Sequence, residues 1–459
     1  MRRRPQTRQK RPVDKTPRDT TITALTHDGR GIGRREDGKV IFINGALPGE
    51  TVRYVEVENR RKFSIGSTLE ILQASEHRVA PKCPVYDRCG GCVLQHLDPN
   101  WQIHHKQQNL LDNFQRIGGL QPETIIPAMM DTHWNYRRRA KFSVQLEAQT
   151  DTLAIGFKEH ASSRIQATDS CDIVHPEISA LLPAVRNTLQ GLEGKRTISH
   201  IEFCVADNAT AMIIGHTNKL AQDDLSTITR FARDNQLELF LQTDKSKTIV
   251  PVNDDIDGET QDTATPLFYE FTEFAIKVEF LPTDFIQVNA NINEQLVSQA
   301  IELLDIQSDD NVLDLFSGVG NFTLPLARKA HHVIGVEGEQ SLVDRAKHNK
   351  ELNQLEHVNF FTANLFTDIM TANSNGEWFT QSFDKILLDP PRAGAMQMIK
   401  HLDRFKASKV VYVSCDPATL ARDAKTMVND HGYHLAKAGV IDMFPQTAHV
   451  ESIAVFEKR

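Results

Sequence analysis

The chain has 459 residues, of which 40% are apolar and 24% charged, the composition of a soluble globular protein of about three domains. No stretch is long and apolar enough to span a membrane, and the basic start lacks the apolar region of a signal peptide, so we expect a cytoplasmic protein without a membrane partner. The net charge of -8 hides an asymmetry, because residues 1–82 carry 18 Lys and Arg against 10 Asp and Glu. A basic front on an acidic body indicates a polyanion-binding part joined to a catalytic or structural part. The alternative is a solvated tail without a partner.

The basic front divides into two segments. Residues 1–18 are polar and basic with almost nothing apolar, which predicts a disordered tail. Residues 19–77 hold short β-rich runs separated by glycines, which predict a small, OB-like β-barrel. The basic residues of its expected loops are Arg30, Arg34, Arg35, Arg60, Arg61 and Lys62.

Cysteines gather just after the barrel. Cys83, Cys89 and Cys92 lie within ten residues, and Cys171 follows much later. Without a secretory signal, metal binding or catalysis is a better interpretation than a disulfide framework. Four thiolates suit tetrahedral zinc or a [4Fe–4S] cluster, and spacing alone does not decide, although a zinc ribbon normally has a second Cys-x2-Cys pair. Cys204 stands in an apolar run and is expected to be a core residue.

The middle of the chain, residues 78–280, predicts an α+β domain. A helix is expected over about 99–117, followed by β-patterned runs with one or two helices. The run Trp134–Lys141 interleaves aromatic and basic residues, which favours base stacking and phosphate contact. The alternative is a strand whose arginine side chains run along the protein surface.

From about residue 285, strands and helices alternate. Expected strands at 311–316, 332–336, 385–388 and 409–413, with helices at 321–329 and 340–352, predict a doubly wound parallel sheet. Two last runs, 435–441 and 453–456, have no convincing helix between them and predict an antiparallel pair.

Three expected strand ends carry candidate ligand-binding residues. A glycine turn with Gly318 and Gly320 follows the first strand, where the backbone can approach a ligand closely. Glu337 follows the next strand, where an acidic residue can accept hydrogen bonds from ribose hydroxyls. Asp389, followed by two prolines, ends a later strand. The alternative is a tight packing turn with a solvated Glu337 and a surface Asp389.

Cys415 comes just past another strand end, on the same expected edge. A free cysteine is often an inert core residue. Beside a ligand cleft and near a helix N-terminus, however, a thiol can have a lowered pKa and act as a nucleophile. Glu451 and His449, close to the C-terminus, are acid–base candidates or ordinary loop residues.

Five segments in this order and spacing resemble the RNA uracil-C5 methyltransferases: Phe285–Asn289, Asp314–Phe322, Asp389–Arg392, Ser414–Thr419 and His449–Ser452. The resemblance implies a class I S-adenosylmethionine-dependent methyltransferase domain at 281–459, with Cys415 as nucleophile and Glu451 as general base. Asp416 stands where many relatives carry Asn, and we expect it to tune the local field. The implied S-adenosylmethionine-binding set is Gln287, Phe316, Asn321, Glu337, Asn364 and Asp389.

The front of the chain extends the resemblance. The barrel at 19–77 is similar to the TRAM type of RNA-binding domain. Family members with Cys-x5-Cys-x2-Cys and a distal cysteine favour a [4Fe–4S] cluster in the central domain, 78–280, with a structural or RNA-positioning role. The implied ligands are Cys83, Cys89, Cys92 and Cys171.

Barrel and cluster together resemble members that modify uracil-1939 of 23S ribosomal RNA. This implies a monomer that acts on a flipped-out uridine in that RNA. The alternatives are another rRNA or tRNA uridine, a non-catalytic RNA-binding assembly factor, or an iron–sulfur redox protein.

Overall fold

The computed structural model describes residues 13–160, 162–243, 248–252, 266–367 and 377–458, and it divides into two compact units. The first comprises Met1–Asn109 and Phe444–His449, and the second comprises Leu110–Met443 and Val450–Arg459. Most of the tail predicted at 1–18 lies outside the described residues. Among the described helices, none has the length and apolar character that a membrane span requires.

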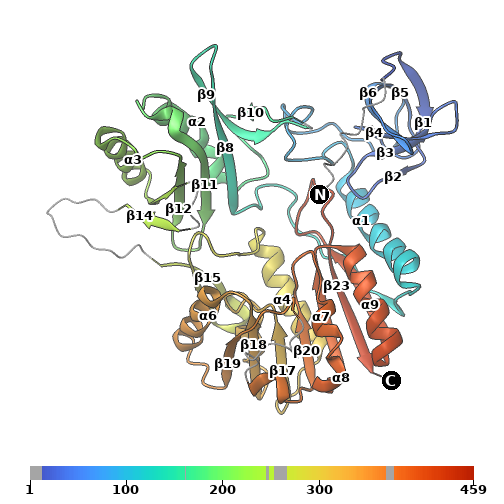
Figure 1. Cartoon of the computed structure of the whole chain (residues 1–459), viewed down its shortest axis with the longest axis vertical. Coiled ribbons are helices and arrows are strands. Elements are labelled where there is room, and N and C mark those ends of the chain that lie inside the picture. The colour runs from blue at the N-terminus through green and yellow to red at the C-terminus, as the bar shows by residue number, and fades with distance from the viewer. Residues whose placement is uncertain (1–12, 161, 244–247, 253–265, 368–376, 459) are drawn as a thin grey trace, which may run out of the picture. The chain divides into compact units, whose positions relative to one another are not determined.

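The first unit is built on a six-stranded sheet with the order β1-β5-β6-β4-β3-β2. Only two residues separate β1 from β2, which stand at opposite ends of this order, so the sheet closes into a small barrel (Figure 1). Alternate side chains point inward, and Ile22, Ile41, Ile43, Val52 and Tyr54 are buried in its core. The predicted barrel is confirmed. Its strands are β1 (Arg18–Thr21), β2 (Ala24–Leu25), β3 (Gly31–Arg34), β4 (Val40–Asn44), β5 (Thr51–Asn59) and β6 (Phe63–Gln73).

Helix α1 (Pro99–Asn113) follows the cysteine segment and continues as one π-helical turn, η1 (Phe114–Gly118). The turn ends at Gly119, whose φ of 69° is the left-handed conformation of a helix C-cap. Gln102 of α1 donates to the side-chain oxygen of Gln446 and accepts from its backbone N–H. This pair holds the Phe444–His449 segment in the first unit.

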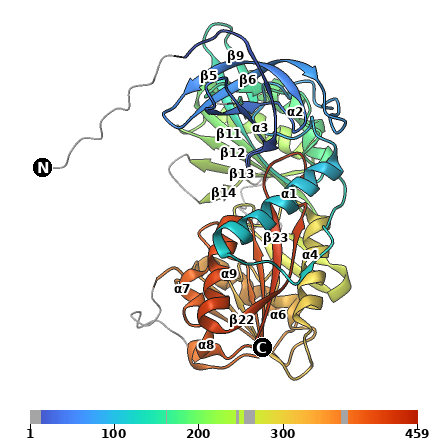
Figure 2. The same ribbon diagram turned by 90° about the vertical axis from the view of Figure 1, so that its right-hand side faces the viewer.

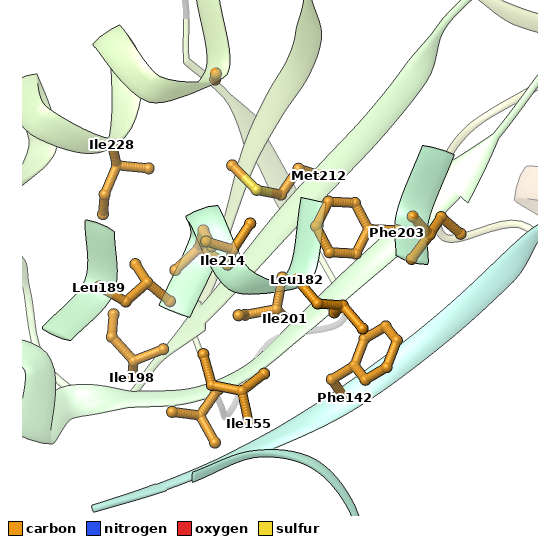
Figure 3. Close-up of a cluster of buried hydrophobic side chains, with 14 of the residues drawn as sticks. Phe142, Ile155, Leu182, Leu189, Ile198, Ile201, Phe203, Met212, Ile214 and Ile228 are labelled. Carbon is orange, nitrogen blue, oxygen red and sulfur yellow. The ribbon is translucent and has the colours of Figure 1, made fainter. Parts of the chain in front are cut away.

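The second unit begins with a seven-stranded sheet of order β10-β9-β8-β11-β12-β13-β14. Helices α2 (Pro176–Gln190) and α3 (Gln222–Asp234) cover one face, and side chains such as Leu182, Leu189 and Ile228 meet the sheet in a hydrophobic core (Figure 3). The strands are β8 (Arg139–Glu147), β9 (Thr152–Lys158), β10 (Ile165–Ala167), β11 (Ile198–Val205), β12 (Thr210–His216), β13 (Leu237–Thr243) and β14 (Ile249–Pro251).

An eight-stranded sheet of order β19-β18-β17-β20-β21-β23-β22-β7 forms the rest of the second unit. A hairpin of β15 (Leu267–Phe271) and β16 (Ile276–Phe280) precedes it. The strands are β17 (Asn311–Leu315), β18 (His332–Glu337), β19 (Val358–Thr362), β20 (Lys385–Leu388), β21 (Lys409–Ser414), β22 (Tyr433–Ile441), β23 (Glu451–Lys458) and β7 (Thr124–Ile125).

Strands β17 to β21 run parallel, and helices flank both faces of this sheet. Figure 2 shows α4 and α6 on one face and α7, α8 and α9 on the other. The doubly wound sheet and the antiparallel β22–β23 pair are therefore confirmed. The helices are α4 (Ala290–Leu304), α6 (Gln340–Leu352), α7 (Met396–Ile399), α8 (Leu402–Phe405) and α9 (Pro417–His431).

The helix predicted at 321–329 is much shorter, since α5 covers only Thr323–Leu326. Pro325 has no N–H and cannot bond to the carbonyl four residues earlier. After Ala327 the backbone bonds tighten, because Arg328 and Lys329 donate to the carbonyls of Pro325 and Leu326, three residues back.

Candidate active site

The ends of the five parallel strands bring most of the predicted site residues to one edge of the sheet. Phe316 follows β17, Asn364 comes two residues after β19, Asp389 follows β20 and Cys415 follows β21, while Glu337 is the last residue of β18. Glu451 is the first residue of β23, which runs antiparallel to β21, so it stands on the same edge. The strand order reverses around β17, and open α/β sheets bind ligands at such a switch point.

The turn after β17 is shaped by its backbone. Phe316 has a φ of 70°, which is uncommon for a bulky residue, and its N–H donates to the carbonyl of Val336 at 2.9 Å. Gly320 has a φ of 98°, and a Cβ there would lie 2.9 Å from Cγ of Leu324. A Cβ on Gly318 would meet no atom within 4 Å. The turn is therefore tight toward α5 and open at Gly318.

Backbone N–H groups hold the carboxylate of Glu337. One oxygen accepts from Gly318 at 3.1 Å, and the other accepts from Gly338 at 2.6 Å and from Glu339 at 3.1 Å. Asn364 is exposed, and its side-chain oxygen accepts from the N–H of Phe366. Both side chains are thus oriented by nearby backbone at the sheet edge.

Three carboxyl groups at this edge have raised pKa values. Burial is the main cause in each case, and it raises the pKa of Asp314 and of Asp389 to about 7. Burial, with the charge of Asp389, holds the pKa of Glu451 well above its usual range. Asp314 accepts from the hydroxyl of Thr323 at 2.5 Å, while its other oxygen is buried without a hydrogen-bond partner among the described residues.

Cys415 and Glu451 directly adjoin the last residue pair of the β21–β23 ladder. Lys409 pairs with Glu457 and the register continues to Ser414 with Ser452, so Cys415 follows and Glu451 precedes this last pair in the sequence. Burial, followed by the charges of Glu451 and Asp389, raises the pKa of the Cys415 thiol to about 11. The lowered pKa that such a position can give a thiol is not found in the donor-free protein, because burial and then the neighbouring carboxylates raise it.

Asp416 acts as the N-cap of α9, where its side chain accepts from the N–H of Thr419 at 2.9 Å. Ser414 also accepts from the N–H of Asp416 at 3.2 Å. These contacts fix the backbone on the C-terminal side of Cys415. Asp416, which stands where many family members carry Asn, therefore has a local structural role.

Gln287 and Asn321 belong to a buried hydrogen-bonded group. The carbonyl of Gln287 accepts from Nε of Arg138 at 2.9 Å. The side-chain oxygen of Asn321 accepts from the hydroxyl of Tyr269 and from the amide of Asn293, both at 2.9 Å. Sequence reasoning missed Tyr269 and Asn293, since no local pattern pairs them with residue 321.

Only the last three residues of the run Trp134–Lys141 lie in a strand, because Trp134–Arg138 precede β8. Strand β8 starts at Arg139, whose guanidinium lies 2.6 Å from the carboxylate of Glu202. Arg138 is buried, so its charge is not available on the surface. Lys141 is exposed.

Three predicted metal ligands lie in turns of the first unit. The N–H of Cys83 donates to the side chain of Gln95 at 3.1 Å, and the N–H of Gly91 points to the sulfur of Cys89 at 3.5 Å. Neither of these two cysteines nor Cys92 forms a disulfide. In the described ranges, no three His, Cys, Asp or Glu side chains are grouped so that they could hold a metal ion.

Cys171 and Cys204 belong to the second unit, as Cys415 does. Cys171 packs against the hydrophobic core of the central sheet, and its N–H donates to the hydroxyl of Ser179. Cys204 is buried on β11, as predicted, and burial raises its pKa to about 11. His449, the second acid–base candidate, lies in the first unit.

Most arginines expected in basic loops of the barrel form ion pairs. Arg30 pairs with Asp28 at 2.6 Å, Arg60 with Glu58 at 2.8 Å, and Arg35 with Glu56 and Asp37. Arg34 donates to the carbonyl of Gly38. Arg61 and Lys62 are exposed, and neither has an ion-pair partner within the part of the chain that the structure describes. The barrel is thus less basic at its surface than its composition suggests.

The sheet order, the glycine turn and the acidic residue at the next strand end define an α/β methyltransferase of the doubly wound class. The Pyrococcus abyssi tRNA (uracil-54, C5)-methyltransferase, solved in complex with S-adenosyl-L-homocysteine, has the same fold. Its TM-score is 0.71 at 22% sequence identity, over 96% of this chain and 100% of that one.

The profile of the tRNA (Uracil-5-)-methyltransferase family matches residues 99–459, and that of the TRAM domain matches residues 18–69. The chain therefore belongs to the RNA uracil-C5 methyltransferase family. The 23S rRNA (uracil(1939)-C(5))-methyltransferase RlmD of Xanthomonas campestris pv. campestris is 44% identical over 97% of this chain and 98% of its own. The RlmD of Stenotrophomonas maltophilia is 43% identical over the same shares.

Proposed function

We propose that this enzyme transfers a methyl group from S-adenosylmethionine to C5 of uracil-1939 in 23S ribosomal RNA, through a covalent bond between Cys415 and C6 of the base. The observation that carries the chemistry is that Cys415 and Glu451 adjoin the last pair of the β21–β23 ladder, Ser414 with Ser452, where the charge of Glu451 acts on the thiol. The choice of RNA rests on the relatives named for that reaction, which cover 97% of this chain at 44% identity.

The residues at the sheet edge fit the methyl donor. The open backbone at Gly318 allows close approach of a ligand, and Glu337 beside it suits the ribose hydroxyls. A buried oxygen of Asp314 and the buried hydroxyl of Ser317 have no protein partner among the described residues. We assign Gln287, Phe316, Asn321, Glu337, Asn364 and Asp389 to the donor site.

The chemistry requires a nucleophile and a base because C5 of uracil reacts poorly by itself. The Cys415 thiolate forms a bond to C6, and the electrons of the C5–C6 double bond move to the O4 enolate. Bound S-adenosylmethionine would supply the electrophilic methyl group: as C5 bonds to this carbon, the S–CH3 bond breaks and S-adenosylhomocysteine is the leaving group. Glu451 then takes the proton from C5, the double bond re-forms and the sulfur of Cys415 leaves C6.

The charges of the site explain when the thiol becomes reactive. With neighbouring carboxylates and burial, the pKa of Cys415 is about 11, so the thiol keeps its proton at neutral pH in the donor-free protein. A cationic sulfonium beside Asp389 offsets the effect of that carboxylate on the thiol. We infer that the nucleophile is activated only when the donor is in place.

The target uridine has to leave its stack to reach a buried edge of a sheet, at a cost of a few kcal/mol. Exposed cations such as Arg61 and Lys62 on the barrel are suited to phosphate contacts that offset this cost. We propose that the enzyme acts as a monomer on a flipped-out uridine.

We further propose that Cys83, Cys89, Cys92 and Cys171 hold a [4Fe–4S] cluster. The support is the family resemblance in cysteine spacing, the suitability of four thiolates for such a cluster, and the backbone N–H of Gly91 directed at the sulfur of Cys89. Anaerobically purified protein should contain about four iron atoms per chain. Cys89→Ala should lose this iron, whereas Cys204→Ala, which removes a core thiol, should retain it. Iron-free wild-type protein, or a zinc content of one per chain, would reject the cluster.

The function is tested with 23S ribosomal RNA from cells that lack this enzyme. Incubation with the protein and radiolabelled S-adenosylmethionine should place one methyl group on C5 of uracil-1939, as mapped by nuclease digestion and mass spectrometry. Methylation of tRNA or of a different uridine would overturn the assigned position. An RNA that binds but is never methylated would indicate an assembly factor instead.

A further inference from the structure

A chain of buried polar side chains connects the central sheet to the glycine turn. Arg138, just before β8, donates from Nε to the carbonyl of Gln287, and its backbone N–H donates to Val288 at 2.9 Å. Its guanidinium carbon lies 4.7 Å from the ring centre of Tyr269, a cation–π contact. The hydroxyl of Tyr269 then donates to Asn321, beside Gly320.

Helix α4 closes this network. Asn293 and Asn321 form a reciprocal amide pair, with N–O distances of 2.9 and 3.1 Å. The side-chain oxygen of Asn321 thus accepts from two protein donors, Tyr269 and Asn293. Its geometry is set by β15 and α4 before any ligand arrives.

Most of the network is buried, which restricts its side chains to the observed hydrogen-bond arrangement. Arg138, Tyr269 and Asn293 have exposed fractions of 5%, 3% and 2%. A polar group buried without its partner costs more than the bond itself contributes, so alternative arrangements are disfavoured. None of these three residues belongs to the five segments that suggested the family.

We propose that Tyr269 and Arg138 are positioning residues for the methyl donor, which act through Asn321 and through the Gln287 segment. This inference rests on the proposed function, because it assumes that Asn321 and Gln287 contact the donor. It goes further by making donor affinity depend on the β15–β16 hairpin and on the start of β8. RNA affinity and the chemical step are expected to depend on other residues.

Tyr269→Phe tests the proposal by removing one oxygen atom. The ring stays under Arg138, while Asn321 keeps only one of its two donors. We expect the KM and Kd for S-adenosylmethionine to rise about threefold to tenfold, the effect of one hydrogen bond, with kcat and the RNA KM within about twofold.

Tyr433→Phe is the matched control. Tyr433 is also buried, and its hydroxyl donates to the carbonyl of Ala407 at 2.6 Å near the opposite ends of the strands. This variant should lose thermal stability without a change in donor affinity. Equal stability losses in both variants, with donor affinity unchanged in both, would reduce Tyr269 to a structural residue and overturn the proposal.

A double-mutant cycle tests the route. In an Asn321→Ala background, Tyr269→Phe should cause no further loss of donor affinity, whereas additive losses would contradict action through Asn321. Arg138→Lys is a second variant, since lysine keeps the charge but cannot present a flat guanidinium to the ring. It should also weaken donor binding, and unchanged binding would remove Arg138 from the proposal. A wild-type protein that fails to bind S-adenosylmethionine would instead refute the proposed function itself.

Discussion

The edge of the eight-stranded sheet and the surface of the barrel handle charge in opposite ways. At the edge, Asp314, Asp389 and Glu451 have no ion-pair partner within the described parts of the chain, and burial raises their pKa values. On the barrel, Arg53 lies between Asp19 and Glu70, and its pKa is raised by those two carboxylates. One region buries carboxyl groups without cationic partners, and the other pairs its exposed charges with each other.

The difference shows what each region is suited to bind. Buried carboxyls without cations are costly to the folded protein and become favourable when a cationic ligand arrives. Exposed ion pairs contribute little to stability and leave a weak net field for an RNA partner. The charge of the sequence suggested that RNA binding follows from the basic front, but on the barrel the paired arginines leave Arg61 and Lys62 as exposed cations without an ion-pair partner among the described residues.

The largest expected effect is at the nucleophile. Cys415→Ala should lower methylation by at least about a thousandfold, because no other group can form the bond to C6. RNA binding should stay within about twofold, since the charges of the barrel are unchanged. Filter binding and methyl incorporation measure both. Residual methylation above one per cent would mean that the sheet edge does not act through this thiol.

Asp389→Asn should remove one of the unpaired carboxyl groups at the sheet edge. Methylation should fall about a hundredfold, because the variant has no carboxylate beside the cationic donor. In the donor-free wild type, Asp389 has a folded pKa of about 7, above its value of about 3.9 in the unfolded chain. Stability therefore falls as pH rises from 4 to 7 and stays low above that.

The same variant should consequently unfold about 2–4 °C higher than the wild type at pH 8, with the difference vanishing near pH 4. Asp403→Asn is the control of opposite sign. The charges and hydrogen bonds of His431 and Lys458 lower the pKa of Asp403, so this substitution should reduce stability above pH 4. An Asp389→Asn protein that is less stable than wild type at pH 8 would show that its carboxylate is compensated within the protein.

Glu451→Gln tests how strongly the carboxyl groups of the sheet edge affect the Cys415 thiol. In donor-free protein, alkylation of Cys415 should accelerate about tenfold per pH unit between pH 7 and 10, as expected for a pKa of about 11. Removal of the neighbouring carboxylate should lower that pKa and speed alkylation at pH 8 by about threefold to tenfold. Peptide mass spectrometry after timed exposure to iodoacetamide measures this rate. Slower alkylation in the variant would contradict the assigned electrostatics.

The smallest effect is expected on the barrel. Replacing both Arg61 and Lys62 with alanine should reduce the slope of log affinity against log salt by about 0.7 for each phosphate that the protein no longer binds. Arg53→Ala is the control, because its guanidinium is already paired with Asp19 and Glu70. Equal changes in both variants would mean that the ion pairs on the barrel open when RNA binds.

The sequence allowed most of the sheet edge to be predicted because β17, β18, β20 and β21 are local, apolar runs with a glycine or proline soon after each end, whereas β19 has neither and was missed. Parallel strands then place Glu337, Asp389 and Cys415 on one edge with no further information. The raised pKa of Cys415 could not be predicted, because it depends first on burial and then on the charge of Glu451, which comes near the thiol through the β21–β23 register. The hydrogen bond between Tyr269 and Asn321 could not be predicted either, because the two residues are 52 positions apart in the sequence.

The central claim is the covalent bond from Cys415 to C6 of the target uracil, and RNA with 5-fluorouridine at the target position tests it most directly. Because fluorine at C5 is not removed as a proton is, enzyme and donor should accumulate a stable adduct. Its mass should equal protein plus RNA plus one methyl group, with the RNA attached at Cys415. The absence of an adduct, or an adduct on another residue, would contradict the mechanism.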